Sequence, residues 1–315
     1  MIVLDVVLLV AFLAVLARSA MFAITSLTNF SKILGISEFA VGFLILSIAT
    51  SSPEISVAVF AVYSGDIGLT LGDIFGSNVT NIAMIAALFL LISPIKKVEQ
   101  KTVRKLSTML IVTALIALVL LGVQDGSRIV GIALLGFFGF FVYQMIKTSK
   151  KEPGIVKEAG SPYKQFLFFL IGITIVIVSA RIVVDSASSI AEYTGIRESV
   201  LGATIIAVGT SLPELVVDIV AVRRRQLELA LGDIIGSSIS NIALVLGLVL
   251  VLSEVTVNFG ILSTLITFVV LSHLGMFLLL RTGRITRWQS FVLFAIYGSF
   301  LIAIYGLQTI ISGFG

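Results

Sequence analysis

Long apolar stretches, separated by short polar segments, follow one another along almost the whole chain. Ten of them reach the roughly 20 residues that a helix needs to cross the hydrocarbon core of a bilayer. They cover residues 2–24, 39–63, 69–93, 103–122, 127–147, 163–187, 198–222, 227–252, 257–280 and 288–312. The pattern therefore predicts an all-α integral membrane protein with ten transmembrane helices.

The composition agrees with this pattern. Hydrophobic residues make up 58% of the chain and charged residues only 12%, and the mean hydropathy is +1.17. This is too little polarity for an ordinary water-facing surface. The first stretch lacks a leading basic region and a small-residue cleavage site, so we expect it to be retained as a span. The sequence contains no cysteine, which excludes disulfides and thiolate metal sites.

The polar segments predict how the chain is divided and oriented. One hydrophilic segment, residues 148–162, separates a first half of five helices (1–147) from a second half of five helices (163–315). Basic residues gather in alternate connections, for example between residues 96 and 105 and between residues 223 and 225. Since basic loops stay cytoplasmic, we expect a multi-pass protein of the cell membrane with both termini outside.

Two nearly identical motifs, "ATSSPEIS" (49–56) and "GTSLPELV" (209–216), mark an internal repeat. A constant offset of 160 residues pairs Thr50 with Thr210, Ser51 with Ser211, Pro53 with Pro213, Glu54 with Glu214, Asp73 with Asp233, Gly76 with Gly236, Ser77 with Ser237 and Asn81 with Asn241. Because each half has an odd number of spans, the second half must enter the membrane from the opposite side. Inverted repeats of this kind are typical of secondary transporters, whose substrate site lies where the repeats meet.

The repeated motif predicts an oxygen-rich site at membrane depth. Proline lacks a backbone donor, so Pro53 and Pro213 should break the second and seventh helices and leave nearby carbonyls free. Glu54 and Glu214 are ionisable groups inside the membrane, which are costly and mark functional sites. With the hydroxyls of the adjacent Thr and Ser residues they form an all-oxygen cage. Such a cage suits Ca²⁺ and offers nothing soft to Cu(I) or Zn²⁺.

The helix that follows each motif predicts a second wall for this site. Asp73, Ser77 and Asn81 are spaced by four residues and therefore share one helical face. The second half repeats the arrangement with Asp233, Ser237 and Asn241. Small residues allow close helix contact in membranes, and four glycines lie on these two helices: Gly72, Gly76, Gly232 and Gly236.

At these residues the chain resembles the cation/Ca²⁺ exchanger superfamily, in particular prokaryotic Ca²⁺/H⁺ or Na⁺/Ca²⁺ antiporters. The family carries two segments of the form Gly-Thr-Ser-x-Pro-Glu, each followed by Gly-Asn-x-x-Gly-Ser-Asn. The resemblance implies a transporter and not an enzyme, which exchanges Ca²⁺ for H⁺ or Na⁺ by alternating access. It makes Glu54 and Glu214 the central ligands of the transported cation. The other implied ligands are Thr50, Thr210, Ser51, Ser211, Ser77, Ser237, Asn81 and Asn241.

The resemblance also implies which partners to expect. The transported cations and the lipid bilayer are the expected partners, and we expect no bound cofactor and no nucleic acid. Since one chain contains both half-sites, a monomer should suffice for transport.

Departures from the family pattern bear on the counter-ion. Asp73 and Asp233 replace the asparagines after glycine, while Asn81 and Asn241 are both amides and cannot titrate. Carboxylates that lie near one another in a low dielectric take up protons readily, so Asp73 and Asp233 are candidates for carrying or gating H⁺. The hydroxyls that would bind Na⁺ are all retained. The acidic pair favours H⁺, and Na⁺ stays open as the alternative.

Other interpretations of single residues and of the whole chain exist. Asp73 and Asp233 would cap helix starts if they lay near the interface, and His273 would be a packed residue or a proton relay. Arg18 and Arg181 would face a cavity or extend toward the interface. A cation channel would also use carboxylates. An intramembrane aspartyl protease would use two aspartates, but the paired glutamates would then have no role.

Overall fold

The computed structural model describes residues 2–34, 42–65, 67–94, 100–121, 128–148, 160–192, 202–253 and 259–312. The first half begins with α1 (Ile2–Leu34), followed by the π-helical segment η1 (Gly42–Leu46), α3 (Ser47–Thr50) and α4 (Ser52–Ser64). It continues with α5 (Ile67–Val79), the π-helical segment η2 (Thr80–Ile85), α6 (Ala86–Ile92), α7 (Gln100–Leu121) and α8 (Arg128–Thr148).

The second half has the same order of elements. It begins with α9 (Pro162–Glu192), followed by the π-helical segment η3 (Gly202–Ile206), α11 (Ala207–Thr210) and α12 (Leu212–Arg223). It continues with α13 (Leu227–Ile239), the π-helical segment η4 (Ser240–Val245), α14 (Leu246–Leu252), α15 (Phe259–Arg281) and α16 (Arg287–Ser312). The predicted linker, 148–162, lies mostly outside the described residues.

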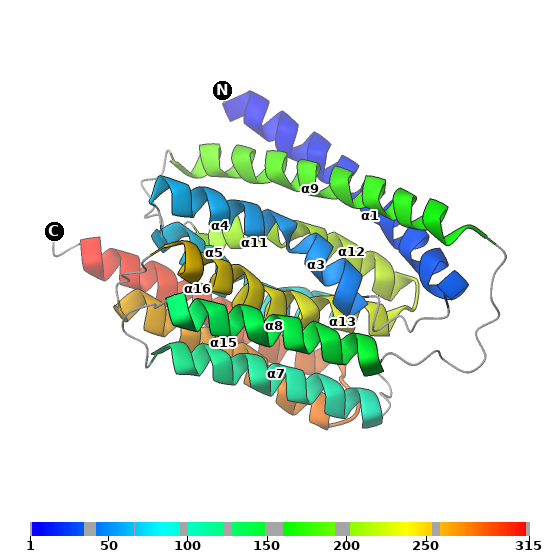
Figure 1. Cartoon of the computed structure of the whole chain (residues 1–315). Helices are drawn as coiled ribbons and strands as arrows, with labels where there is room; N and C mark the ends of the chain where they lie inside the picture. Colours follow the sequence, from blue (N-terminus) through cyan, green and yellow to red (C-terminus); the bar gives the residue numbers. More distant parts are fainter. Residues whose placement is uncertain are drawn as a thin grey trace.

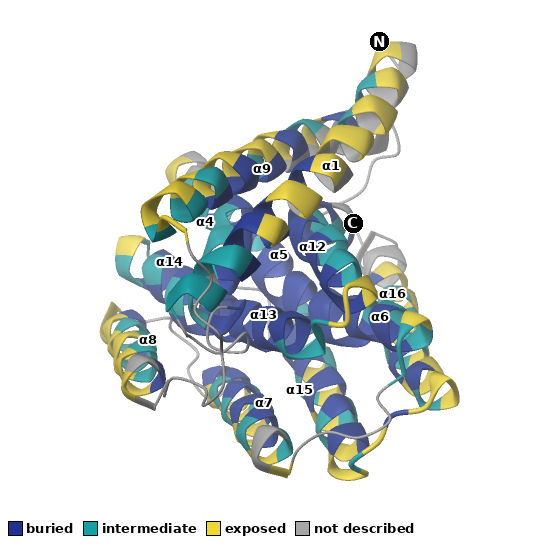
Figure 2. Cartoon of the chain, turned by 90° about the vertical axis from the view of Figure 1, so that its right-hand side faces the viewer, coloured by how far each residue is buried: buried dark blue, intermediate teal, exposed yellow. Residues whose placement is uncertain are grey.

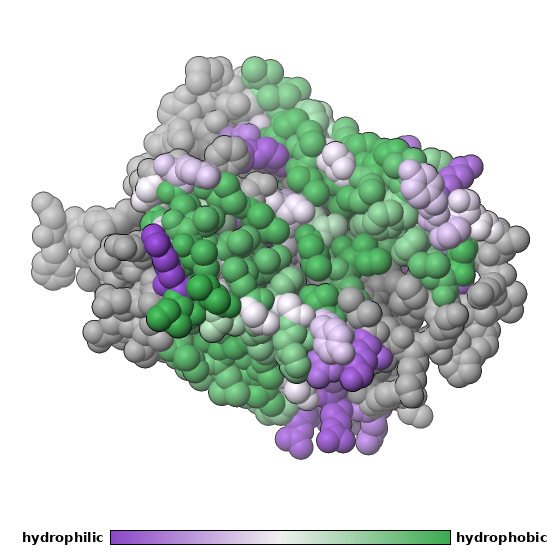
Figure 3. Space-filling view, viewed as in Figure 1, coloured by the Kyte–Doolittle hydropathy of each residue, from purple (hydrophilic) through white to green (hydrophobic). Residues whose placement is uncertain are grey.

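The helices confirm an all-helical membrane protein. Seven helical spans among the described residues are long and apolar enough to cross a bilayer, and eight if the bent unit of η1, α3 and α4 is one span. Figure 3 shows a face that is mainly apolar along the helices, with hydrophilic side chains gathered mainly toward their ends. The total of ten spans stays a prediction.

The first and sixth helical stretches extend further than their hydropathy predicts. The predicted spans 2–24 and 163–187 are α1, which continues to Leu34, and α9, which continues to Glu192. Residues 25–34 mix polar and apolar side chains, and Leu27 is fully buried against the rest of the protein. Tertiary packing therefore extends the helix beyond the apolar run.

α1 and α9 lie side by side along one side of the bundle (Figure 1). Their rings pair along the contact, with centroids 5.8 Å apart for Phe22 and Phe168 and 5.3 Å apart for Phe30 and Phe166. A Cβ atom at Gly172 would lie 3.0 Å from Ala23, so the backbones approach closely there.

α5 and α13, with the segments that continue them, form the buried centre. In the apolar stretch of each of the spans 67–92 and 227–252, 83% of the residues are buried, against 17–39% in the other membrane-length spans among the described residues. Figure 2 shows this interior surrounded by helices with exposed outward faces. The polar residues of these two helices are therefore shielded from lipid.

Glycines let the two halves interlock at this centre, as predicted. A Cβ atom at Gly76 would lie 2.6 Å from the carbonyl oxygen of Ala203, and one at Gly236 would lie 2.6 Å from the Ser47 hydroxyl. Both contacts join α5 or α13 to the broken helix of the other half. Gly76 and Gly236 are therefore needed for the approach that brings the polar faces together.

Candidate cation site

Each broken helix is interrupted at the serine before its Ser-Pro or Leu-Pro pair. α3 ends at Thr50, and α4 begins at Ser52 with Pro53 in its first turn. The axis of residues 42–50 and that of residues 52–63 differ by 45°. The second half has the same break at Ser211, between α11 and α12. Because proline has no N–H group, the turn before it loses a helical hydrogen bond. The predicted interruption of both helices is confirmed.

The two halves exchange matching hydrogen bonds at these breaks. The Thr210 hydroxyl donates to Oδ1 of Asp73 over 2.9 Å, and the Thr50 hydroxyl donates to Oδ1 of Asp233 over 3.3 Å. A serine completes each side: the hydroxyls of Thr210 and Ser77 lie 3.3 Å apart, and those of Thr50 and Ser237 lie 3.4 Å apart. Each polar helix face therefore contacts the broken helix of the other half.

All twelve residues predicted for the site are fully buried. They are Glu54, Glu214, Thr50, Thr210, Ser51, Ser211, Ser77, Ser237, Asn81, Asn241, Asp73 and Asp233, and each has 0% of its surface exposed. The structure thus brings the two motifs and the two following helices into one interior region, as the repeat predicted. Their role as ligands stays a prediction.

Many oxygen atoms in this region have no partner of normal hydrogen-bond geometry within the described residues. They include both carboxylate oxygens of Glu54 and Glu214, the hydroxyls of Ser51 and Ser211, and the amide oxygens of Asn81 and Asn241. The Thr210 hydroxyl lies close to the Glu54 carboxylate, and the hydroxyls of Thr50 and Ser237 lie close to that of Glu214. Buried oxygens without partners are costly, and a bound cation would satisfy them.

The carboxylates do not form a metal cluster by themselves. Among the described residues, no three acidic or histidine side chains lie close enough together to hold one ion. A cation between Glu54 and Glu214 would therefore need the hydroxyls and amides around them. Ca²⁺ accepts such mixed and flexible oxygen ligands.

Asp73 and Asp233 are not helix caps. α5 begins at Ile67 and α13 at Leu227, so each aspartate lies well inside its helix and bonds to a threonine of the other half. The alternative that placed them at helix starts is wrong. Their threonine partners came from the distant repeat, which local sequence did not reveal.

Asp218 is a buried acidic residue of this region that sequence reasoning missed. It lies on α12, one turn after Glu214, with 0% of its surface exposed. Its carboxyl interacts with those of Asp233 and Glu214. The repeat offset pairs Asp218 with Ala58, so the repeat contains no matching acid that would mark it. An acidic residue within an apolar span was the signal that could have identified it.

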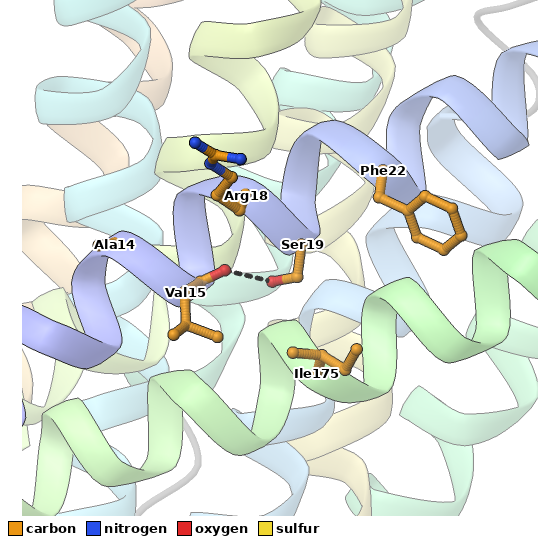
Figure 4. Close-up of a pocket in the computed structure, with 6 residues that line it drawn as sticks. All are labelled: Ala14, Val15, Arg18, Ser19, Phe22 and Ile175. Carbon is orange, nitrogen blue, oxygen red and sulfur yellow. Dashed lines mark hydrogen bonds between the residues drawn. The ribbon is translucent and has the colours of Figure 1, made fainter.

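Sequence reasoning left the roles of three further residues open, and the structure places each of them. The His273 ring is fully buried, and Nδ1 lies 2.8 Å from the Val269 carbonyl oxygen of the preceding turn. The exposed Arg181 side chain pairs with Asp185 at 2.9 Å. Arg18 lines a pocket of about 460 Å³ that is otherwise mainly apolar (Figure 4). None of these contacts involves either of the two glutamates.

The fold is shared with known transporters. The sodium–calcium exchanger NCX_Mj, in a form soaked with Na⁺ and Sr²⁺, superimposes with a TM-score of 0.78 at 28% identity, covering 94% of this chain and 97% of that chain. Its form without Na⁺ and Ca²⁺ gives a TM-score of 0.80 at 27% identity, covering 97% and 99%. The fold and site thus define a multi-pass membrane antiporter.

Sequence comparisons identify the family. A profile of the sodium/calcium exchanger protein family matches residues 4–147 and 164–306. The putative antiporter CaxA of Alkalimonas amylolytica is 32% identical over 230 residues, covering 70% of this chain and 72% of the relative. The sodium/calcium exchanger MaX1 of Methanosarcina acetivorans is 27% identical over 351 residues, covering 97% and 99%. The chain belongs to the sodium/calcium exchanger family and is a cation/Ca²⁺ antiporter, not an enzyme.

Proposed function

We propose that this antiporter exchanges Ca²⁺ for H⁺ across the membrane by alternating access. The observation that carries the proposal is the pair of Thr–Asp hydrogen bonds between the halves, Thr210 to Asp73 and Thr50 to Asp233. They place two aspartates beside the two motif glutamates. Asp218 adds a fifth carboxyl to this group, and five interacting carboxylates in a low dielectric cannot all stay ionised, so the region holds cations or takes up protons.

In this proposal Glu54 and Glu214 bind Ca²⁺ in their deprotonated form and release it when they take up protons. The surrounding hydroxyls and the amides of Asn81 and Asn241 complete the coordination shell. Their full burial and their unpartnered oxygens support this assignment. The related NCX_Mj has been soaked with Ca²⁺ and with Sr²⁺, which share this preference for oxygen ligands.

Asp73 and Asp233 tune or relay the protons. Each carboxylate accepts a hydrogen bond from the threonine beside a glutamate and leaves its Oδ2 atom without a partner of normal geometry. A proton can therefore be held one side chain away from the bound Ca²⁺. Asn81 and Asn241 cannot hold a proton and serve as neutral ligands.

Exchange of Ca²⁺ for Na⁺ is the second candidate. All six hydroxyls expected to bind Na⁺ are buried in the site. The relative MaX1, which spans nearly the whole chain, is a sodium/calcium exchanger. Na⁺ would then occupy hydroxyl-lined positions beside the two glutamates while Asp73 and Asp233 stay protonated.

The proposed transport cycle uses ten spans in two inverted halves, with basic loops inside and both termini outside. The repeated order of elements and the two matched segments of the family profile support the division into halves. α1 and α9 lie together beside the bundle and move as a pair against the fixed central site. Motion of one body against a site between the repeats is common in such transporters.

The counter-ion is tested with purified protein in liposomes. Ca²⁺ uptake is measured under an imposed pH gradient without Na⁺, and under a Na⁺ gradient at equal pH on both sides. We expect the pH gradient to drive uptake, and Asp73→Asn and Asp233→Asn to reduce this uptake at least about tenfold. Uptake that follows Na⁺ and ignores the pH gradient contradicts the proton assignment and leaves the exchanger assignment in place.

Uptake without any opposing gradient would indicate a channel. Glu54→Gln in the same liposomes controls for leakage, since it lacks one of the two central carboxylates. Liposomes whose pH gradient has been dissipated with a proton ionophore serve as the control for the imposed gradient.

A further inference from the structure

Asp218 breaks the pseudo-symmetry of the central region. On α12 it lies four residues after Glu214, and the equivalent position on α4 is Ala58, which packs in an apolar cluster with Leu71 and Ile74. The other acidic residues of the site occur as matched pairs. The second half therefore holds one buried carboxylate that the first half lacks.

The Asp218 carboxyl has no positively charged partner within the described part of the chain. It is fully buried, and neither oxygen has a hydrogen-bond partner of normal geometry. No ion pair joins it to a lysine or arginine in the described ranges, and the nearby Arg223, Arg224 and Arg225 are exposed on the α12–α13 turn. A buried carboxylate without a counter-charge is strongly destabilising.

Asp218 faces another unsatisfied acid. Its carboxyl lies within interaction distance of Asp233 on α13, and Glu214 is the next nearest acidic neighbour. Oδ1 of Asp233 accepts a hydrogen bond from the Thr50 hydroxyl. Its Oδ2 has no partner of normal geometry among the described residues. The two carboxyl groups therefore lie within hydrogen-bonding reach of each other between α12 and α13, and three of their four oxygens have no other partner among the described residues.

The position of this acid pair is distinct from the central site. Four residues of helix correspond to about 6 Å along the axis, so Asp218 lies about one turn from Glu214 toward the α12–α13 turn. Asp233 likewise precedes Ser237 by one turn on α13. The pair thus lies on one side of the central glutamates only.

We propose that Asp218 and Asp233 form a second cation-binding position, which takes an oxygen-preferring cation, Ca²⁺ or Na⁺, beside the central site. The two carboxylates supply the charge, and the Thr50 hydroxyl, already bonded to Asp233, lies at its edge. The position has no counterpart in the first half, so the approaches to the central site from the two ends of the protein differ. This inference adds a site to the proposed function and rests on its assignment of the central glutamates.

The test is a count of bound cations in the purified protein. Equilibrium binding of radioactive Ca²⁺, and separately of radioactive Na⁺, is measured for the wild type, Asp218→Ala, Asp218→Asn and Glu54→Gln. We expect Asp218→Ala to lose one equivalent of one of these cations and to keep the central Ca²⁺. Glu54→Gln should lose the central Ca²⁺ and keep the equivalent that depends on Asp218.

Asp218→Ala introduces the residue that the first half has at the equivalent position, Ala58. Asp218→Asn keeps the size of the side chain and is used if the alanine variant does not fold. The elution profile in detergent establishes folding for each variant. Unchanged binding of both cations in a folded Asp218 variant would overturn the inference, and the pair would then hold a proton. Absence of Ca²⁺ binding in the wild type would instead count against the central site.

Discussion

The Thr210 hydroxyl donates a 2.9 Å hydrogen bond to Oδ1 of Asp73, although the two residues are 137 positions apart in the chain. Its equivalent joins Thr50 to Asp233 over 3.3 Å. In each case a threonine beside a helix break contacts an acid on the central helix of the other half. This crossed arrangement makes the site a joint product of both repeats.

Replacing either threonine by valine should weaken Ca²⁺ binding. Valine keeps the shape but removes a hydrogen-bond donor from a buried carboxylate, which costs about 1–3 kcal/mol. We expect the apparent Ca²⁺ affinity of Thr210→Val and Thr50→Val to fall by about 5- to 150-fold, measured by titration calorimetry. Thr113→Val is the control, because the buried Thr113 hydroxyl bonds only to Met109 O of its own helix among the bonds resolved. Equal Ca²⁺ affinities of all three variants would show that the crossed hydrogen bonds do not contribute to Ca²⁺ binding.

Replacing either central glutamate by glutamine should abolish Ca²⁺ transport. A neutral amide has the same size but cannot balance a divalent cation in a buried site. We expect the initial rate of Ca²⁺ uptake into liposomes to fall at least about tenfold for Glu54→Gln and for Glu214→Gln, which corresponds to ~1.4 kcal/mol or more. Asp185→Asn, at an exposed residue of α9 paired with Arg181, should leave the rate unchanged. Substantial flux in either glutamine variant would refute the assigned centre.

A methyl group at Gly76 should destabilise the protein. The added Cβ would lie 2.6 Å from the Ala203 carbonyl oxygen and 2.7 Å from its Cα atom, and backbone atoms cannot move aside cheaply. Overpacking of this kind costs about 1–3 kcal/mol. We expect Gly76→Ala to lower the thermal unfolding temperature in detergent and the transport rate.

Gly139→Ala on α8 is the matched control for this change. A Cβ atom there meets nothing within 4 Å among the described residues, and alanine favours the helix by up to about 1 kcal/mol. It should be as stable as the wild type or more stable. Equal thermal stability of the two variants would show that the close approach at Gly76 is dispensable.

Linking α1 to the α12–α13 turn should stop turnover without preventing Ca²⁺ binding. Gln226 donates a 2.8 Å hydrogen bond to the Thr28 hydroxyl, so the two side chains are within reach of a short thiol crosslinker. The chain has no cysteine, so a Thr28→Cys/Gln226→Cys variant reacts only there. If α1 and α9 move against the bundle, the crosslinked protein binds Ca²⁺ in solution and fails to transport it.

The control crosslink joins the two helices that are proposed to move together. Phe22→Cys/Phe168→Cys links α1 to α9, where the wild-type rings lie 5.8 Å apart. This variant should transport at the wild-type rate after crosslinking. Full activity of the verified Thr28–Gln226 crosslink would contradict the proposed motion.

The sequence alone determined the class of the fold and predicted most residues of the candidate site. Apolar runs of membrane length predict helices because every backbone group must be satisfied inside the bilayer. The positions of the breaks followed from Pro53 and Pro213, since the missing N–H group acts locally. The constant offset between the motifs identified the paired glutamates without any knowledge of their contacts.

Other features depended on tertiary packing. α1 continues to Leu34 because its last turns pack against the protein, although their composition is mixed. The π-helical segments at Thr80–Ile85 and Ser240–Val245 contain Asn81 and Asn241, and no local pattern predicted them. Such segments often occur at functional sites.

The partners of the buried acids were decided only by the three-dimensional structure. Asp73 and Asp233 have no local feature that separates a helix cap from a site residue, and their threonine partners lie in the other repeat. Asp218 matches Ala58 and so had no signal in the repeat, yet it meets Asp233 because α12 packs against α13. Periodicity and offset encode which residues share a helical face. Which faces meet depends on how the two halves pack, and that is a property of the whole chain.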